Sequence, residues 1–117
     1  MVALRAESST QDEHFYADAP VDLVFLSSLS MGDRALETEI LGMFASQLPN
    51  YLSALCVNDA PDHRKIALHT LKGAAKSVGA LHLSELAKKL EDDPTISNDE
   101  LLQEAARVAE FIASISR

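Results

Sequence analysis

The stretch that decides the fold is residues 60–92, which read APDHRKIALHTLKGAAKSVGALHLSELAKKLED. The first part, about residues 60–78, has Pro61 in its first turn, and Gly79 is placed to end it. The second part, about residues 81–92, is a shorter helix whose inward side consists of Leu83, Leu86 and Leu90. Because the connection is short, the two helices are expected to be antiparallel neighbours.

Two more helices are expected before this stretch. The first covers about residues 21–29, with Pro20 at its start, where a missing N–H costs nothing. The second covers about residues 33–56, and its apolar stripe consists of Leu36, Ile40, Phe44, Leu48, Leu52 and Leu55. Since an interior proline removes a backbone hydrogen bond, Pro49 predicts either a kink near residues 45–49 or two abutting helices.

A fifth helix is expected towards the C-terminal end, and it opens with Ser97-Asn98-Asp99-Glu100, the spacing of a capping box. Its apolar side consists of Leu101, Ala105, Val108, Ile112 and Ile115. No segment alternates strictly between apolar and polar residues, so no strands are expected. The prediction is an all-α fold, an up-and-down antiparallel four-helix bundle with a short extra N-terminal helix. Residues 1–19 are predicted to be a flexible lead-in, and residues 20–117 the bundle.

Composition narrows the classes of function. The net charge of −8 argues against binding to nucleic acid or to anionic lipid, which needs a basic surplus. The single cysteine, Cys56, cannot form an internal disulfide, which favours a reducing compartment and a cytoplasmic location. No apolar run approaches the roughly 18 residues that a membrane-spanning helix needs. Each apolar stripe is narrow enough to be buried within one bundle, so a monomer is expected.

The helix expected at residues 60–78 groups unusual residues on one side. At about 100° per residue, Lys65, Lys72, Gly73 and Lys76 all lie within about 60° of His69. The opposite side, expected to face the core, consists of Ala67, Leu71, Ala74 and Val78. The pattern therefore predicts that His69 lies at the centre of the solvent-facing side, ringed by three lysines and one glycine.

This grouping suits a phosphoryl site. An exposed neutral imidazole is a competent nucleophile at physiological pH. Phosphoryl transfer asks the protein mainly for positioning and for positive charge near the moving oxygens, which Lys72, Lys65 and Lys76 would supply. Gly73 removes side-chain bulk beside the ring at a cost of roughly 1 kcal/mol of helix stability against alanine. From these residues alone, a solvated histidine among solubilising lysines remains the alternative.

Residues 69–80, HTLKGAAKSVGA, resemble the signature of histidine phosphotransfer (HPt) domains: His, two residues, Lys, Gly, small residues and then Gly-Ala. LPNYLSAL, at residues 48–55, is similar to the family's proline-bearing helix. PVDLVFLSSLSMGDRALETEIL, at residues 20–41, is similar to its N-terminal half, so the resemblance covers about residues 20–117. It implies that His69 is the phospho-acceptor, Lys72 the phosphate-facing lysine and Gly73 the glycine that gives a partner access.

The family also tends to place a polar residue, often glutamine, on the following helix, where it hydrogen-bonds the imidazole. Glu91 stands at that place. A carboxylate there would hold the second ring nitrogen but would also repel a phosphoryl group, and a plain solvated acid is equally compatible with the sequence.

The function that the resemblance implies is that of a phosphocarrier, which relays a phosphoryl group through His69 between aspartates of response-regulator receiver domains. Its partners would be those receivers and a hybrid histidine kinase. The chain has four glycines and no glycine-rich loop for a triphosphate, so no kinase activity and no cofactor are expected. With one cysteine and no His-x-x-x-His pair, no metal site is expected either.

Two alternatives belong to other classes of protein. One is the phospho-acceptor half of a histidine kinase, in which an acidic residue usually follows the histidine, whereas Thr70 follows it here. The other is a helical module that binds a receiver without phosphotransfer, and such a module would typically have lost its histidine.

Overall fold

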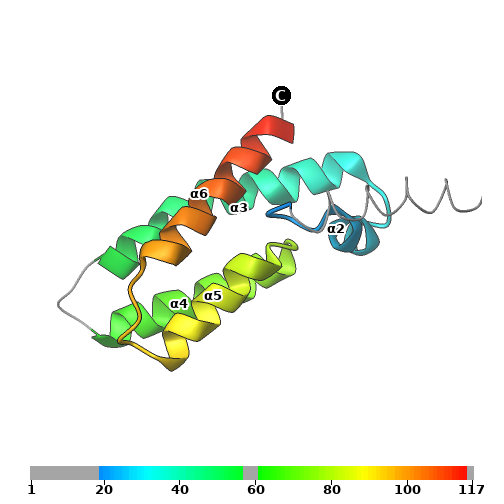
Figure 1. Cartoon of the computed structure of the whole chain (residues 1–117). Helices are drawn as coiled ribbons and strands as arrows, with labels where there is room; N and C mark the ends of the chain where they lie inside the picture. Colours follow the sequence, from blue (N-terminus) through cyan, green and yellow to red (C-terminus); the bar gives the residue numbers. More distant parts are fainter. Residues whose placement is uncertain (1–18, 57–60, 116–117) are drawn as a thin grey trace, which may run out of the picture.

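The computed structural model describes residues 19–56 and 61–115, and within these ranges the chain is entirely helical (Figure 1). The helices are α2 (Leu23–Ser30), α3 (Arg34–Cys56), α4 (Pro61–Ser77), α5 (Leu81–Asp92) and α6 (Asp99–Ile115). The predicted all-α class is therefore confirmed, as is the short N-terminal helix. The lead-in predicted for residues 1–19 lies outside the described residues, except for Ala19.

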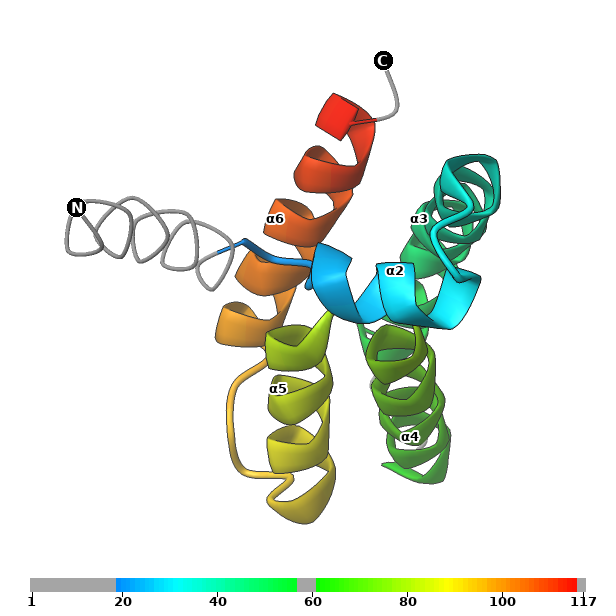
Figure 2. The same ribbon diagram turned by 90° about the vertical axis from the view of Figure 1, so that its right-hand side faces the viewer.

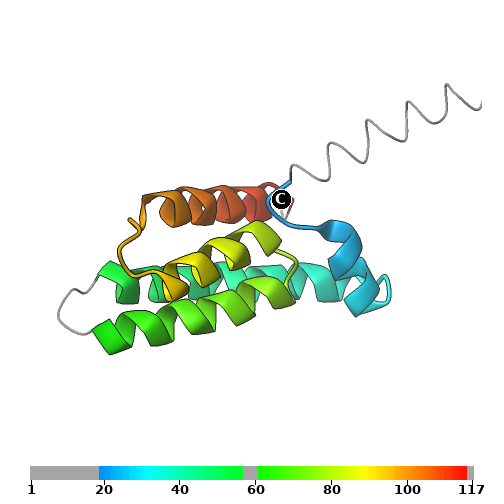
Figure 3. The same cartoon turned by 60° about the horizontal axis from the view of Figure 1, so that its bottom comes forward.

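The four longer helices form the bundle. The helices α4, α5 and α6 each run antiparallel to the helix before them, and α6 packs beside α3 (Figure 3). The helix α2 lies across one end of the bundle (Figure 2). The largest fully buried side chains come from all five helices and from the segment just before α2, and they form a single core: Val21, Leu26, Leu41, Leu55, Leu68, Leu71, Leu83, Leu90, Leu101 and Val108. None of the described helices is both long and apolar enough to cross a lipid bilayer.

A hydrogen bond joins α2 to the turn between α4 and α5. The backbone N–H of Asp22 donates to the carbonyl of Gly79 over 2.8 Å, and the Asp22 carboxylate accepts from the N–H of Phe25, which caps α2. Gly79 ends α4 with φ at +86°, as the sequence predicts, and a Cβ there would lie 2.9 Å from the Asp22 carbonyl oxygen. Glycine is therefore needed at this turn for two reasons, its left-handed backbone and the close approach of a second chain segment.

The structure decides one alternative for α3 and corrects the core faces predicted for two helices. The helix α3 continues through Pro49, which excludes two abutting helices, and the kink near residues 45–49 stays a prediction. Leu36 and Ile115, expected to face the core, are exposed, whereas Leu41 is buried. Leu36 and Ile115 lie in terminal turns of their helices, where neighbouring helices cover less of the surface.

The start of α6 also differs from its prediction. The carbonyl of Asn98 accepts the first helical hydrogen bond from Leu102, so Asn98, and not Ser97, is at the N-cap position. The Ser97 hydroxyl instead accepts from the N–H of Asp99, only two residues further on. The side-chain carbonyl of Asn98 accepts a hydrogen bond from Arg64 over 2.8 Å, which ties this end of α6 to α4.

Candidate functional site

The face of α4 that meets the core decides how the candidate residues lie. The His69 side chain is 68% exposed, as the helical periodicity predicts. The buried side, however, includes Leu68 and Ala75, while Ala74 is only half-buried, so the core face is rotated by about 40° from the predicted one. This rotation brings Lys72 to the edge of the buried face, where its side chain is only 28% exposed.

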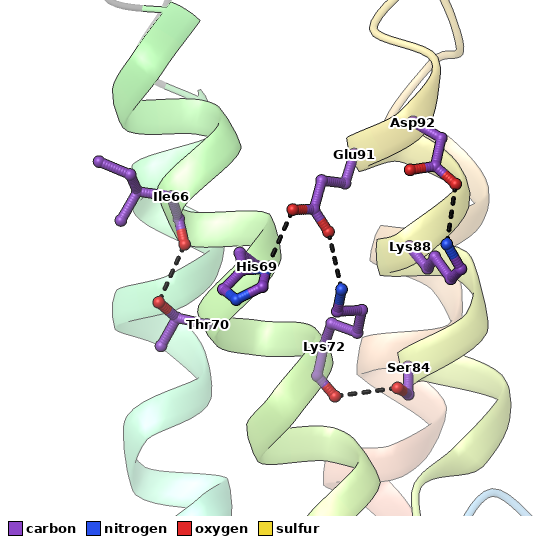
Figure 4. Close-up of polar contacts among 8 residues, drawn as sticks. All are labelled: Ile66, His69, Thr70, Lys72, Ser84, Lys88, Glu91 and Asp92. Atoms are coloured by element: carbon purple, nitrogen blue, oxygen red, sulfur yellow. Dashed lines mark hydrogen bonds and ion pairs between the residues drawn. The ribbon is translucent and has the colours of Figure 1, made fainter.

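Three charged or polar side chains from two helices meet at this edge (Figure 4). Glu91, on α5, places one carboxylate oxygen 3.0 Å from Nδ1 of His69 and the other 3.1 Å from Nζ of Lys72. Since a carboxylate is only an acceptor, Nδ1 of His69 is the donor in this contact. In the neutral imidazole, Nε2 then carries the free lone pair, on a ring that is largely open to solvent.

The ion pair keeps Glu91 charged. The hydrogen bond from Lys72 lowers the pKa of Glu91; partial burial opposes this, and the hydrogen bond from His69 adds to the lowering. The carboxylate is therefore ionised at neutral pH, where it accepts a charge-assisted hydrogen bond from His69 and forms an ion pair with Lys72.

A buried serine fixes α5 against α4 at the same level. The hydroxyl of Ser84 donates to the backbone carbonyl of Lys72 over 2.9 Å, and Ser84 is itself buried (Figure 4). Sequence reasoning missed this residue, although one signal was present: a serine lies directly beside Leu83 on the inward side of a leucine-rich helix. The bond sets the axial position of the two helices that supply His69, Lys72 and Glu91.

The remaining candidate residues lie on the open surface of α4. Gly73 is exposed, and a Cβ built there has no atom within 4 Å, so packing within the domain does not require glycine. Lys65 and Lys76 are exposed one or two turns from His69 along the same helix. The structure thus brings together His69, Lys72 and Glu91 and leaves the other three to face solvent.

Positive charge is concentrated on the two helices of the site. All five lysines of the chain belong to α4 or α5: Lys65, Lys72, Lys76, Lys88 and Lys89. Residues 61–92 contain six Lys and Arg against four Asp and Glu, whereas the whole chain contains ten against eighteen. The surface around His69 is therefore the basic part of an acidic molecule, which favours an anionic partner. Among residues 19–56 and 61–115, no group of three or more His, Cys, Asp or Glu side chains could hold a metal ion.

Comparison with protein families identifies a match to the Hpt domain over residues 39–117, which is more than half of the chain. Comparison with curated proteins and with solved structures gave no significant match. The matched region contains α4, α5 and α6 and most of α3. It also contains His69, Glu91 and Lys72. The chain belongs to the Hpt domain family, whose members are phosphocarriers of two-component signalling.

Proposed function

We propose that this protein relays a phosphoryl group through His69 between aspartates of response-regulator receiver domains. The observation that supports this most directly is the state of the His69 ring. Its Nδ1 is held by Glu91 at 3.0 Å, and its side chain is 68% exposed, which leaves Nε2 available to a partner.

In the proposed reaction, the lone pair of Nε2 attacks the phosphorus of an aspartyl phosphate on the donor receiver. The N–P bond forms, the P–O bond breaks, and its electron pair stays with the donor aspartate. In the second half, a carboxylate of the acceptor receiver attacks the phosphorus, and the electron pair of the N–P bond returns to Nε2. His69 is thus a nucleophile in one direction and a leaving group in the other.

The other residues have supporting roles in this proposal. Lys72 supplies positive charge where phosphoryl charge develops, and Glu91 orients the ring. Gly73 leaves room for the approaching receiver. Lys65 and Lys76 extend the basic field that guides an acidic partner. A hybrid histidine kinase is the proposed source of the phosphoryl group.

The direct test is to incubate the protein with a receiver domain carrying a radioactive aspartyl phosphate. Label should move to this chain, resist alkali and be lost in acid, as expected for a phosphoramidate. Binding of the receiver without label would favour the interaction module instead. Labelling that requires ATP and a kinase domain, and that no phosphorylated receiver can supply, would favour the kinase half.

Replacing Lys72 with alanine should slow transfer in both directions by roughly tenfold, because one charge-assisted contact to the phosphoryl oxygens is lost. Single-turnover assays against a phosphorylated receiver measure this rate. Lys88→Ala is the matched control, since Lys88 is also paired with a carboxylate, Asp92 at 3.1 Å, but lies outside the His69 contact (Figure 4). Equal rates for the Lys72 variant and the unmodified protein would assign the phosphate contact to Lys65 or Lys76.

We also propose that the protein is a monomer in the cytoplasm. All five helices contribute to one buried core within a single chain, and a relay partner must reach the exposed side of α4. Light scattering should give the chain mass of 12.7 kDa. A mass twice as large would contradict the monomer.

A further inference from the structure

The ammonium group of Lys72 already has a partner before any phosphoryl group arrives. We propose that Glu91 raises the phosphoryl-transfer potential of phosphorylated His69 by competing with the phosphoryl group for Lys72. This inference rests on the proposed function, since it concerns the phosphorylated state of His69. It makes Glu91 a positioning residue that acts through Lys72 and favours onward transfer.

The first step of the argument is that the Lys72–Glu91 pair is sheltered. The two side chains are 28% and 13% exposed, and their atoms lie 3.1 Å apart. The neighbouring pair of Lys88 and Asp92 has nearly the same distance, but its side chains are 62% and 64% exposed. Because water screens a sheltered pair less, Lys72 is held more firmly than a typical surface lysine.

The second step concerns charge. A phosphoryl group adds a charge of about −1.5 to −2 at neutral pH, if it behaves as phosphate esters do. Glu91 contacts Nδ1 of the His69 ring, and the phosphoryl group would be bonded to Nε2 of the same ring. The carboxylate and the phosphoryl group would therefore be two anions next to one imidazole. Lys72 is the cation already bound to one of them. If Lys72 moves towards the phosphoryl group, its ion pair with Glu91 is weakened. If Lys72 stays paired with Glu91, the charge of the phosphoryl group is not compensated.

The third step is the consequence for equilibrium. In the unphosphorylated protein, the Glu91 carboxylate contacts Nδ1 of His69 with one oxygen and Nζ of Lys72 with the other. On transfer to the acceptor, the N–P bond breaks, its electron pair returns to Nε2, and a new P–O bond forms on the aspartate. Lys72 is then free to resume its full contact with Glu91. This regained contact favours the side of the equilibrium on which the receiver carries the phosphoryl group.

Glu91→Gln tests the inference, because the amide oxygen can still accept from Nδ1 while the negative charge is lost. The protein and a receiver are brought to phosphoryl equilibrium, and the ratio of the two phosphorylated species is measured. The share on His69 should rise about two- to fivefold, the range typical of partly exposed ion pairs. An unchanged or lower share on His69 would overturn the inference. Glu91→Ala should shift the ratio in the same direction and serves if the glutamine variant is unstable.

A double-mutant cycle separates competition for Lys72 from direct repulsion. In a Lys72→Ala background, Glu91→Gln should leave the ratio unchanged, because the cation that the two anions share is gone. An equal shift in both backgrounds would show that Glu91 acts directly on the phosphoryl group and would refute the competition. Asp92→Asn is the matched control, since it removes a charge from the same turn of α5 without contacting Lys72.

The two proposals fail in different ways. If the unmodified protein takes no acid-labile label from any phosphorylated receiver, the proposed function is wrong. If it takes the label but the Glu91 variants leave the equilibrium ratio unchanged, only the role of Glu91 is wrong.

Discussion

Replacing His69 with glutamine should abolish labelling from a phosphorylated receiver and leave the domain folded. Glutamine offers no ring nitrogen to attack phosphorus, so the loss should be complete rather than partial. The His69 side chain is exposed, and Glu91 keeps its ion pair with Lys72 when the imidazole is removed. The free energy of unfolding should therefore change by only about 0.5 kcal/mol, as is usual for surface substitutions. Label transfer and thermal unfolding followed by circular dichroism measure the two effects.

The other described histidines provide matched controls. His63 lies in the first turn of α4 and His82 in the first turn of α5, and both are exposed. The same change to glutamine at either position should leave labelling intact, because the Glu91 carboxylate that holds the ring lies against His69. Label that persists in His69→Gln, or that disappears in His82→Gln, would place the phospho-acceptor elsewhere.

Local signals account for most of what the sequence predicted about the fold. Pro61 begins α4, and a positive φ at Gly79 ends it, because these residues limit the backbone whatever surrounds them. The errors lie where contacts between segments far apart in the sequence decide where a helix begins or which of its sides is buried. Asp22, and not Pro20, sets the first residue of α2, and the backbone of Asp22 is also held by Gly79, 57 residues away in the chain.

The candidate site was predictable in its centre and less so at its edge. The periodicity of one helix was enough to predict that His69 is exposed to solvent. It placed Lys72 on the solvent side as well, whereas the packing of α5 rotates the core face towards Lys72 and half-covers it. Glu91 was reached only through the family resemblance, because its contact with His69 joins two helices and spans 22 residues of chain. No pattern within a single helix encodes such a contact.

Gly73→Gln should keep or raise the melting temperature while it cuts transfer from a receiver on the order of 10- to 100-fold, as misplaced reactants typically do. Glycine is a poor residue inside a helix, and its replacement by a good helix former stabilises by up to about 1 kcal/mol. The space beside Gly73 is open, so the new side chain meets nothing within the domain. Residues four apart on a helix are neighbours, however, so the glutamine would stand next to the His69 ring, where the receiver must bring its aspartate.

Two comparisons decide whether the effect is steric. A small donor such as phosphoramidate should still label His69 in the Gly73 variant, because it needs far less room than a receiver domain. Gly42→Gln is the matched control, since Gly42 is also an exposed glycine inside a helix with nothing within 4 Å of a Cβ, but it belongs to α3. That variant should gain similar stability and transfer at the normal rate. If Gly73→Gln unfolds the domain, or if phosphoramidate labelling falls as far as transfer from the receiver, then Gly73 does not act by giving the receiver access to the ring.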